Sequence, residues 1–166
     1  MKAVGPYCLD TNVIIWGIKK ESSAGQEHMI PLVRNFLDEL SASGATVILP
    51  AIAVGESIVH MESDAIRQEF VQQLKESFLI VPFDEKAAVE FARVWNELYA
   101  DGTVEEMREK DPCYSRNKLK ADVLITATAI AYEARYMVTH DPGLQKTCSK
   151  WMRPIPIEAG RFMFDH

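Results

Sequence analysis

The sequence predicts an α/β protein in which a parallel sheet is sandwiched between layers of helices. Short apolar, β-branched runs alternate with longer segments whose apolar residues recur every three or four positions. This alternation is typical of parallel sheets, because a helix usually carries the chain back between parallel strands. The strand candidates are continuously apolar, which indicates burial on both faces. We expect one domain over residues 1–166.

Five short segments are candidate strands. They are residues 6–9, 46–49, 78–81, 135–139 and 153–157. An acidic residue or a proline follows each of the first four closely, which indicates where the strand ends. The fifth segment contains two prolines, which cannot donate ladder hydrogen bonds, so it is an edge strand at best.

Helical periodicity fills most of the chain between the strands. The predicted helices are residues 28–43, 51–61, 63–76, 84–100 and 117–134. The first has a clear apolar stripe that ends at Gly44, whereas the last is apolar on nearly every side and should be buried. Residues 18–27 and 101–116 are polar and are expected to be exposed loops that flank a functional site.

Composition excludes several classes of protein. The net charge of −6 argues against a protein that coats nucleic acid through bulk charge, although it does not exclude an enzyme that acts on nucleic acid. No apolar run is long enough to span a membrane, and three scattered cysteines favour a reducing cytoplasm. No glycine-rich phosphate loop is present, which argues against an NTPase.

Four acidic residues interrupt segments that are otherwise suited to burial. Asp10 and Asp141 follow predicted strands, and the carboxyl ends of parallel strands share one edge of a sheet. Glu56 and Asp122 stand among apolar helical residues, where a carboxylate is costly unless it is paired or binds a metal. Each acid alone has an ordinary explanation, as a turn, a helix surface or a first-turn residue. Together they indicate one acidic metal site.

A site made only of carboxylates suits the hard cations Mg²⁺ and Mn²⁺. Such ions polarise phosphoryl oxygens, which points to phosphodiester hydrolysis. Without metal, crowded carboxylates repel and raise one another's pKa. We therefore predict that Mg²⁺ or Mn²⁺ raises the melting temperature.

The acidic motifs, taken in order, resemble those of PIN-domain ribonucleases, and most closely the VapC-like toxins of toxin–antitoxin pairs. They are LDTNVII at 9–15, Glu56 in a helix after the second strand, KADVLITATAIA at 120–131 and MVTHD at 137–141. The resemblance covers roughly residues 6–158. It implies a three-layer α/β/α sandwich with a mainly parallel five-stranded sheet. It also implies an endoribonuclease that leaves a 5′-phosphate.

The same resemblance implies that Asp10, Glu56, Asp122 and Asp141 are the metal-binding and catalytic residues. Asn12 and Thr139 match positions near the site in the family. Asn12 could orient Asp10 or a water molecule, and Thr139 could hydrogen-bond a carboxylate or a phosphate. Helix capping and an ordinary strand position remain open explanations for these two residues.

Contacts to substrate and partners are predicted less sharply. The basic residues before Asp122 are candidate phosphate contacts, although solvated charges at a helix start explain them as well. These residues are Arg116, Lys118 and Lys120. Stacking on bases is one interpretation of Trp16, Trp95 and Trp151, and core packing is the simpler one.

The resemblance also suggests an antitoxin protein as partner. The apolar helical faces at 28–43 and 51–76 could bind the antitoxin or form a homodimer, with core packing as the default interpretation. The alternative to an RNA-cleaving enzyme is a catalytically weak PIN-like module that binds RNA or docks a protein. The presence of all four acids argues against that alternative.

Overall fold

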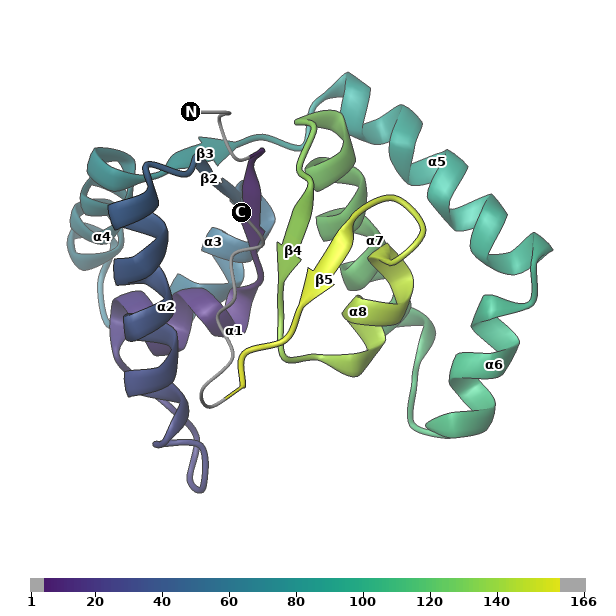
Figure 1. The fold of residues 1–166 in the computed structure, drawn as a ribbon, viewed down its shortest axis with the longest axis horizontal. Coiled ribbons are helices and arrows are strands. Elements are labelled where there is room, and N and C mark those ends of the chain that lie inside the picture. The colour runs from purple at the N-terminus through teal and green to yellow at the C-terminus, as the bar shows by residue number, and fades with distance from the viewer. Residues whose placement is uncertain (1–4, 159–166) are drawn as a thin grey trace.

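Five parallel strands form the centre of the protein in a computed structural model, which describes residues 5–158 (Figure 1). The strands are β1 (Tyr7–Leu9), β2 (Val47–Pro50), β3 (Leu79–Val81), β4 (Tyr136–Val138) and β5 (Arg153–Ile155). Their order is β3-β2-β1-β4-β5, and every neighbouring pair is parallel. The predicted five-stranded sheet is confirmed.

The sheet order places β1 in the middle, directly beside β4. Cys8 lies opposite Met137 in β4 and opposite Ile48 in β2, and Leu9 lies opposite Val138. The ends of β1 and β4 are therefore level at one edge of the sheet. The proline-containing strand β5 lies at an edge, as the sequence predicted.

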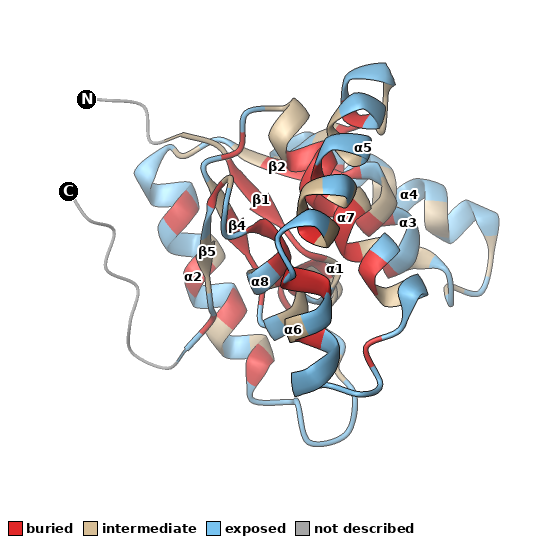
Figure 2. Ribbon diagram, turned by 90° about the vertical axis from the view of Figure 1, so that its right-hand side faces the viewer, coloured by how far each residue is buried: buried red, intermediate tan, exposed pale blue. Residues whose placement is uncertain are grey.

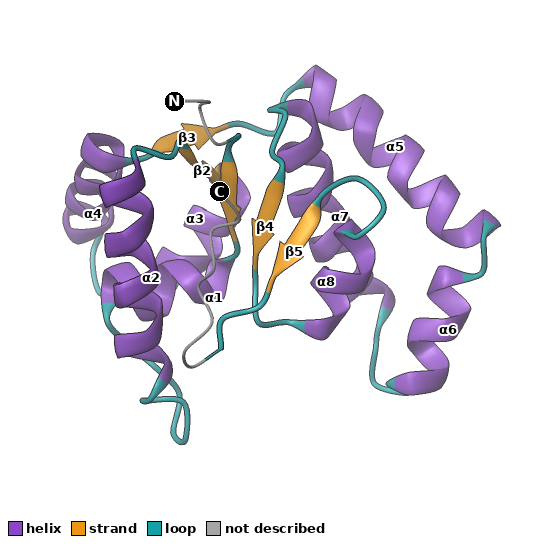
Figure 3. Cartoon of the chain, in the orientation of Figure 1, coloured by secondary structure: helices purple, strands orange, loops and turns teal. Residues whose placement is uncertain are grey.

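Helices surround this sheet (Figure 3). They are α1 (Thr11–Ile14), the π-helical turn η1 (Ile15–Lys19), α2 (Met29–Ser43), α3 (Ala51–Ile58), α4 (Asp64–Ser77), α5 (Glu85–Ala100), α6 (Thr103–Lys110), α7 (Arg116–Ala131) and α8 (Pro142–Cys148). The five predicted helices correspond to α2, α3, α4, α5 and α7, with ends that differ by up to three residues.

Four short helical segments lie outside the predicted helices, namely α1, η1, α6 and α8. The prediction of a loop over 101–116 is wrong in part, because α6 forms within it and buries Val104 and Met107. The predicted loop over 18–27 likewise begins inside η1, which ends at Lys19. The start of α8 is marked by Asp141 as N-cap and Pro142 in the first turn.

The helices form the two outer layers of an α/β/α sandwich. Figure 2 shows α2 on one side of the sheet and α3, α5 and α7 on the other, with buried residues concentrated between them. The helix α7 buries residues on most of its circumference, as its apolar sequence predicted. None of the helices within residues 5–158 is long and apolar enough to cross a bilayer.

The apolar interior divides into a main core around the sheet and a smaller one between α5, α6 and α7. The smaller core consists of Val94, Leu98, Val104, Met107, Tyr114, Leu119 and Val123. Its members come from the segment that the sequence analysis predicted to be a loop and from the helices on either side. This core holds the start of α7 in place, which matters for the site described next.

Candidate active site

Asp10 lies at the junction of β1 and α1, where it caps the helix. Its Oδ1 accepts a hydrogen bond from the backbone N–H of Thr11 at 2.6 Å, and its Oδ2 accepts one from the hydroxyl of Thr139 at 2.8 Å. Its own backbone N–H donates to the carbonyl oxygen of Val138 at 3.1 Å. Only 6% of Asp10 is exposed, so its carboxylate is both buried and fixed in direction.

Thr139 joins the ends of the two central strands. Its hydroxyl donates to Asp10 and accepts from the backbone N–H of Asp141 at 3.0 Å. The side chain is fully buried, so it contacts a carboxylate and cannot reach a phosphate in this arrangement. The side chain of Asn12 is exposed, and the hydrogen bonds to Asp10 come from Thr11 and Thr139 instead.

Glu56 reaches the same edge from α3, the helix that directly follows β2. Its Oε2 accepts a hydrogen bond from the hydroxyl of Thr11 at 2.6 Å. Thr11 therefore contacts two of the acids, Asp10 through its backbone and Glu56 through its side chain. Glu56 is exposed, in contrast to the buried Asp10.

Asp122 projects from the second turn of α7 and is 6% exposed. The phenol of Tyr114 donates a hydrogen bond to its Oδ2 at 2.6 Å. Burial, followed by the charge of Asp122, raises the pKa of Tyr114, so this phenol stays protonated and remains a donor. Tyr114 belongs to the small core between α5, α6 and α7, which therefore sets the position of Asp122.

Asp141 caps α8. Its Oδ1 accepts hydrogen bonds from the backbone N–H groups of Gly143 at 2.7 Å and Leu144 at 3.3 Å. Its Oδ2 accepts one from the ammonium of Lys118 at 2.5 Å. Burial alone would lower the pKa of Lys118, but the hydrogen bond to Asp141 and the charge of Asp122 raise it overall. Lys118 is thus a charged partner of the acids.

Gly143 allows Asp122 and Asp141 to approach each other. A Cβ atom at this position would lie 2.8 Å from Tyr114 Cε2, 3.0 Å from Asp141 Oδ1 and 3.2 Å from Asp122 Oδ2. The two carboxylates and the ring of Tyr114 therefore converge on one point, and a Cβ atom there would clash with the ring and crowd both carboxylates.

Electrostatics connect the four acids. Burial raises the pKa of Asp10 to about 6, and the charges of Asp141 and Glu56 add to the shift, although hydrogen bonds from Thr139 and Thr11 oppose it. The pKa of Asp122 is likewise raised to about 7, with burial as the largest cause. The charges of Asp141 and Asp10 contribute to this rise, while the hydrogen bond from Tyr114 and the charge of Lys118 oppose it. Excess negative charge is costly here, which is the environment that a cation relieves.

The structure brings Asp10, Glu56, Asp122 and Asp141 to one edge of the sheet. In the part of the chain that is described, however, no three acidic, histidine or cysteine side chains are arranged to hold a metal ion. Lys118 and Tyr114 occupy oxygen atoms of Asp141 and Asp122 in this arrangement. The donor set still suits Mg²⁺ or Mn²⁺, because it consists of carboxylate oxygens, the ligands that these hard cations prefer.

The three predicted substrate contacts separate onto two sides of α7. Lys118 faces the acids, whereas Arg116 and Lys120 line a cleft against α5. The guanidinium of Arg116 lies over the ring of Trp95, 5.7 Å from its centre.

Two residues of the site, Tyr114 and Thr11, were not predicted from the sequence. The only signal for Thr11 was its place in LDTN beside Asp10.

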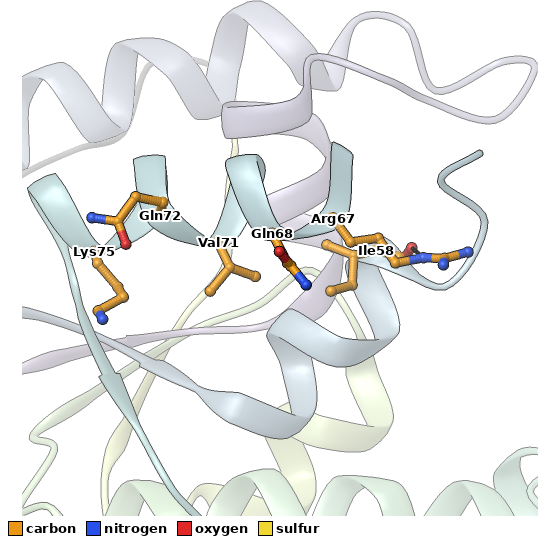
Figure 4. Close-up of a pocket in the computed structure, with 6 residues that line it drawn as sticks. All are labelled: Ile58, Arg67, Gln68, Val71, Gln72 and Lys75. Atoms are coloured by element: carbon orange, nitrogen blue, oxygen red, sulfur yellow. Dashed lines mark hydrogen bonds between the residues drawn. The ribbon is translucent and has the colours of Figure 1, made fainter. Parts of the chain in front are cut away.

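A second hollow lies between α3 and α4 and has a volume of about 360 Å³ (Figure 4). It is lined by Ile58, Arg67, Gln68, Val71, Gln72 and Lys75. None of the four acids lines it, so it is separate from the acidic edge. Large apolar side chains of Val59 and Ile66 are exposed at the end of α3 and on α4, with 58% and 45% of their surfaces accessible.

Comparisons with known proteins agree with this architecture. The PIN domain family matches residues 7–150. Solved structures of similar fold include VapBC2 from Rickettsia felis bound to a DNA fragment from its promoter, with a TM-score of 0.61 and 19% identity over 92% of this chain and 99% of the other. VapBC-1 from nontypeable Haemophilus influenzae has a TM-score of 0.60 and 16% identity over 91% and 97%. DNA-bound VapBC from Salmonella typhimurium has a TM-score of 0.59 and 16% identity over 92% and 98%. No protein of curated function matches this chain in sequence.

Proposed function

The chain belongs to the PIN domain family, and from this premise we propose that it is a Mg²⁺- or Mn²⁺-dependent endoribonuclease. PIN domains are generally nucleases. The observation that carries the proposal is the continuous set of contacts from Glu56 through Thr11 to Asp10, and from Asp10 through Thr139 to Asp141. Acids far apart in the sequence are thereby held at one edge.

We assign metal binding to Asp10, Glu56, Asp122 and Asp141. A divalent cation bound by them would polarise a phosphoryl oxygen and stabilise the charge that develops on cleavage. The protein's own contribution is to fix the ligands in direction. Hydrogen bonds from neighbouring residues do this for Asp10, and the phenol of Tyr114 does it for Asp122.

Lys118 has two roles in the proposed reaction. Its ammonium balances the charge of Asp141 when no cation is bound. It also lies at the acidic edge with 38% of its side chain exposed, so it is available to a phosphate of the substrate. Of the three predicted substrate contacts, only Lys118 therefore lies at the acids, whereas Arg116 and Lys120 line the cleft against α5.

We further propose that the protein is the toxin of a toxin–antitoxin pair. The solved structures of similar fold are VapBC assemblies. Each match covers at least nine-tenths of this chain and of the other chain. The surface between α3 and α4, with its hollow and the exposed Val59 and Ile66, is the candidate site for an antitoxin or for a second copy. The apolar residues of α2 are buried or partly buried, and none of its large apolar side chains is fully exposed, so that helix is the weaker candidate.

Cleavage of a labelled single-stranded RNA tests the enzymatic proposal. We expect cutting with Mg²⁺ or Mn²⁺, none with EDTA, and products that carry a 5′-phosphate. Asp10→Asn should abolish cutting while leaving the melting curve cooperative. Asp38→Asn, at an exposed acid of α2, is the matched control and should cut normally. Full activity in Asp10→Asn, purified in the same way, would overturn the assignment.

One observation favours a second candidate, an RNA-binding or protein-docking module with little catalysis. Lys118 already neutralises Asp141, and residues 5–158 contain no ready-made group of three metal ligands. RNA binding without metal-dependent cutting would select this candidate. The two candidates make opposite predictions for the same assay.

A further inference from the structure

We propose that the cleft between α5 and α7 binds bases of single-stranded RNA next to the acidic site, an inference that rests on the proposed ribonuclease function. The cleft has a volume of about 600 Å³. It is lined by Phe91, Ala92, Trp95, Asn96, Arg116, Asn117 and Lys120. Figure 1 shows α5 running along the outer side of α7, away from α2 and α4.

Aromatic rings form a row along α5. Phe91, Trp95 and Tyr99 are four residues apart and thus share one side of the helix. The rings of Phe91 and Trp95 are stacked with centres 5.7 Å apart, and those of Trp95 and Tyr99 are tilted with centres 5.4 Å apart. All three are half-buried, so part of each ring remains accessible. Phe91 and Trp95 line the cleft, and the guanidinium of Arg116 covers the ring of Trp95, so a base that stacks on this ring would take the place of the guanidinium. Bases stack on aromatic rings largely regardless of sequence.

Positive charge and amide groups complete the cleft. Arg116 and Lys120 are exposed and line it, and no acidic residue is among the lining residues. The cleft is therefore locally cationic in a protein whose net charge is −6. Asn96 and Asn117 supply donors and acceptors of the kind that hydrogen-bond exposed base edges. Aromatic rings for stacking on bases, together with cations for pairing with phosphates, favour a nucleic-acid strand over an apolar peptide as the ligand of this cleft.

The cleft is connected to the acids through α7. Positions 116 and 120 face the cleft, whereas Lys118 and Asp122 face the acidic edge from the opposite side of the same two turns. A helix is roughly 10 Å across. A flexible strand can therefore pass around the start of α7, with bases in the cleft and a phosphate at the acids. A duplex is too wide and too stiff to follow this path, so the cleft selects single strands.

Tryptophan fluorescence gives a direct test in EDTA, where no cleavage is expected. The probe is a single-stranded RNA of about ten nucleotides, comparable to the site sizes of other single-strand binders. We expect the RNA to quench the fluorescence of the wild type and of Trp151→Phe, but much less that of Trp95→Phe. Quenching that is unchanged in Trp95→Phe would overturn the proposal.

Binding measured by anisotropy of labelled RNA adds quantitative comparisons. Trp95→Ala should weaken binding about tenfold or more, and Trp95→Phe should retain most of the affinity because it keeps a ring. Lys120→Glu changes an exposed side chain and should not affect folding, yet it should also weaken binding. Arg34→Glu, at an exposed residue of α2 that lines neither hollow, is the matched control and should bind normally. Wild-type affinity in a folded Trp95→Ala and in Lys120→Glu would refute the cleft.

The outcomes for the cleft and for the enzyme can be separated. If the wild type binds RNA through Trp95 but does not cut it with metal, the cleft stands and the catalytic proposal fails. If metal-dependent cutting persists and Trp95→Ala binds RNA normally, the cleft alone is wrong. Loss of binding to a co-expressed protein partner in Trp95→Ala, with RNA affinity unchanged, would assign the cleft to that partner and would also refute the proposal.

Discussion

Replacing Asp122 by asparagine should stabilise the metal-free protein at alkaline pH. The buried carboxylate has a pKa raised from 3.8 to about 7, so the folded state holds a proton that the unfolded state has lost over this range. The free energy of unfolding therefore falls as the pH rises from about 4 to about 7, and the cost is complete above pH 7. The difference between these two pKa values corresponds to about 4 kcal/mol. The substituted amide would carry no charge, while its oxygen could still accept the hydrogen bond from Tyr114.

Thermal unfolding in EDTA at several pH values measures this effect. For a chain of this size, about 4 kcal/mol corresponds to a melting temperature higher by about 10 °C for Asp122→Asn than for the wild type at pH 8. The two proteins should converge near pH 4, where the wild-type carboxyl is protonated. In the Asp122→Asn variant, the melting temperature should still fall with rising pH, but less steeply, because the pKa of Asp10 is raised to about 6.

Two comparisons make the prediction specific. Asp38→Asn, at an exposed acid, should follow the wild type at every pH. Mg²⁺ should raise the melting temperature of the wild type more than that of Asp122→Asn, because the variant lacks one proposed ligand. Parallel pH curves for the wild type and Asp122→Asn would show that this carboxylate is not under electrostatic stress, and the reasoning would be wrong.

Three further changes probe the same edge of the sheet. Gly143→Ala would place a methyl group 2.8 Å from a ring atom of Tyr114 and about as close to two acids, so we expect a loss of about 1–3 kcal/mol in stability, measured by urea unfolding, and weaker cutting. Tyr114→Phe removes a hydrogen bond that lowers the pKa of Asp122, so the acidic limb of the activity profile should move to higher pH, and an unmoved limb would count against the contact. Lys118→Met removes the cation that competes for Asp141, so Mn²⁺ should bind more tightly in calorimetric titrations, whereas weaker binding would contradict this role.

The sequence predicted the main elements of the fold because their signals are local. Short apolar runs identified four strands, the proline-containing segment 153–157 was recognised as an edge strand, and the helical stripes located α2 and α5 within one residue at each end. The helix α6 was missed because its sequence TVEEMREK is mostly charged and buries few apolar residues. Its two main buried residues, Val104 and Met107, are buried only because they pack against side chains of α5 and α7. A helix that depends on tertiary packing leaves little trace in its own sequence.

The candidate site was predicted in outline and missed in its supporting contacts. Acids that interrupt apolar segments can be recognised in a sequence, because their burial requires a reason. The phenol of Tyr114, in contrast, comes from a segment without periodicity, and only the folded chain shows that it reaches Asp122. The separation of Arg116 from Lys118 does follow from helix geometry, since residues two apart point to opposite sides. That inference needed the start of α7, which lies one residue before the predicted start.

The order of the strands has a consequence for the newly synthesised chain. The central strand β1 is made first, but its neighbour β4 and the acid beyond it come from the last third of the sequence. A ribosome-bound chain that ends before Thr139 lacks both the hydroxyl that orients Asp10 and the carboxylate of Asp141. Pairing across such a long stretch is also a late event in folding. A cell that makes this protein would therefore be exposed to its proposed activity only after synthesis has passed Asp141.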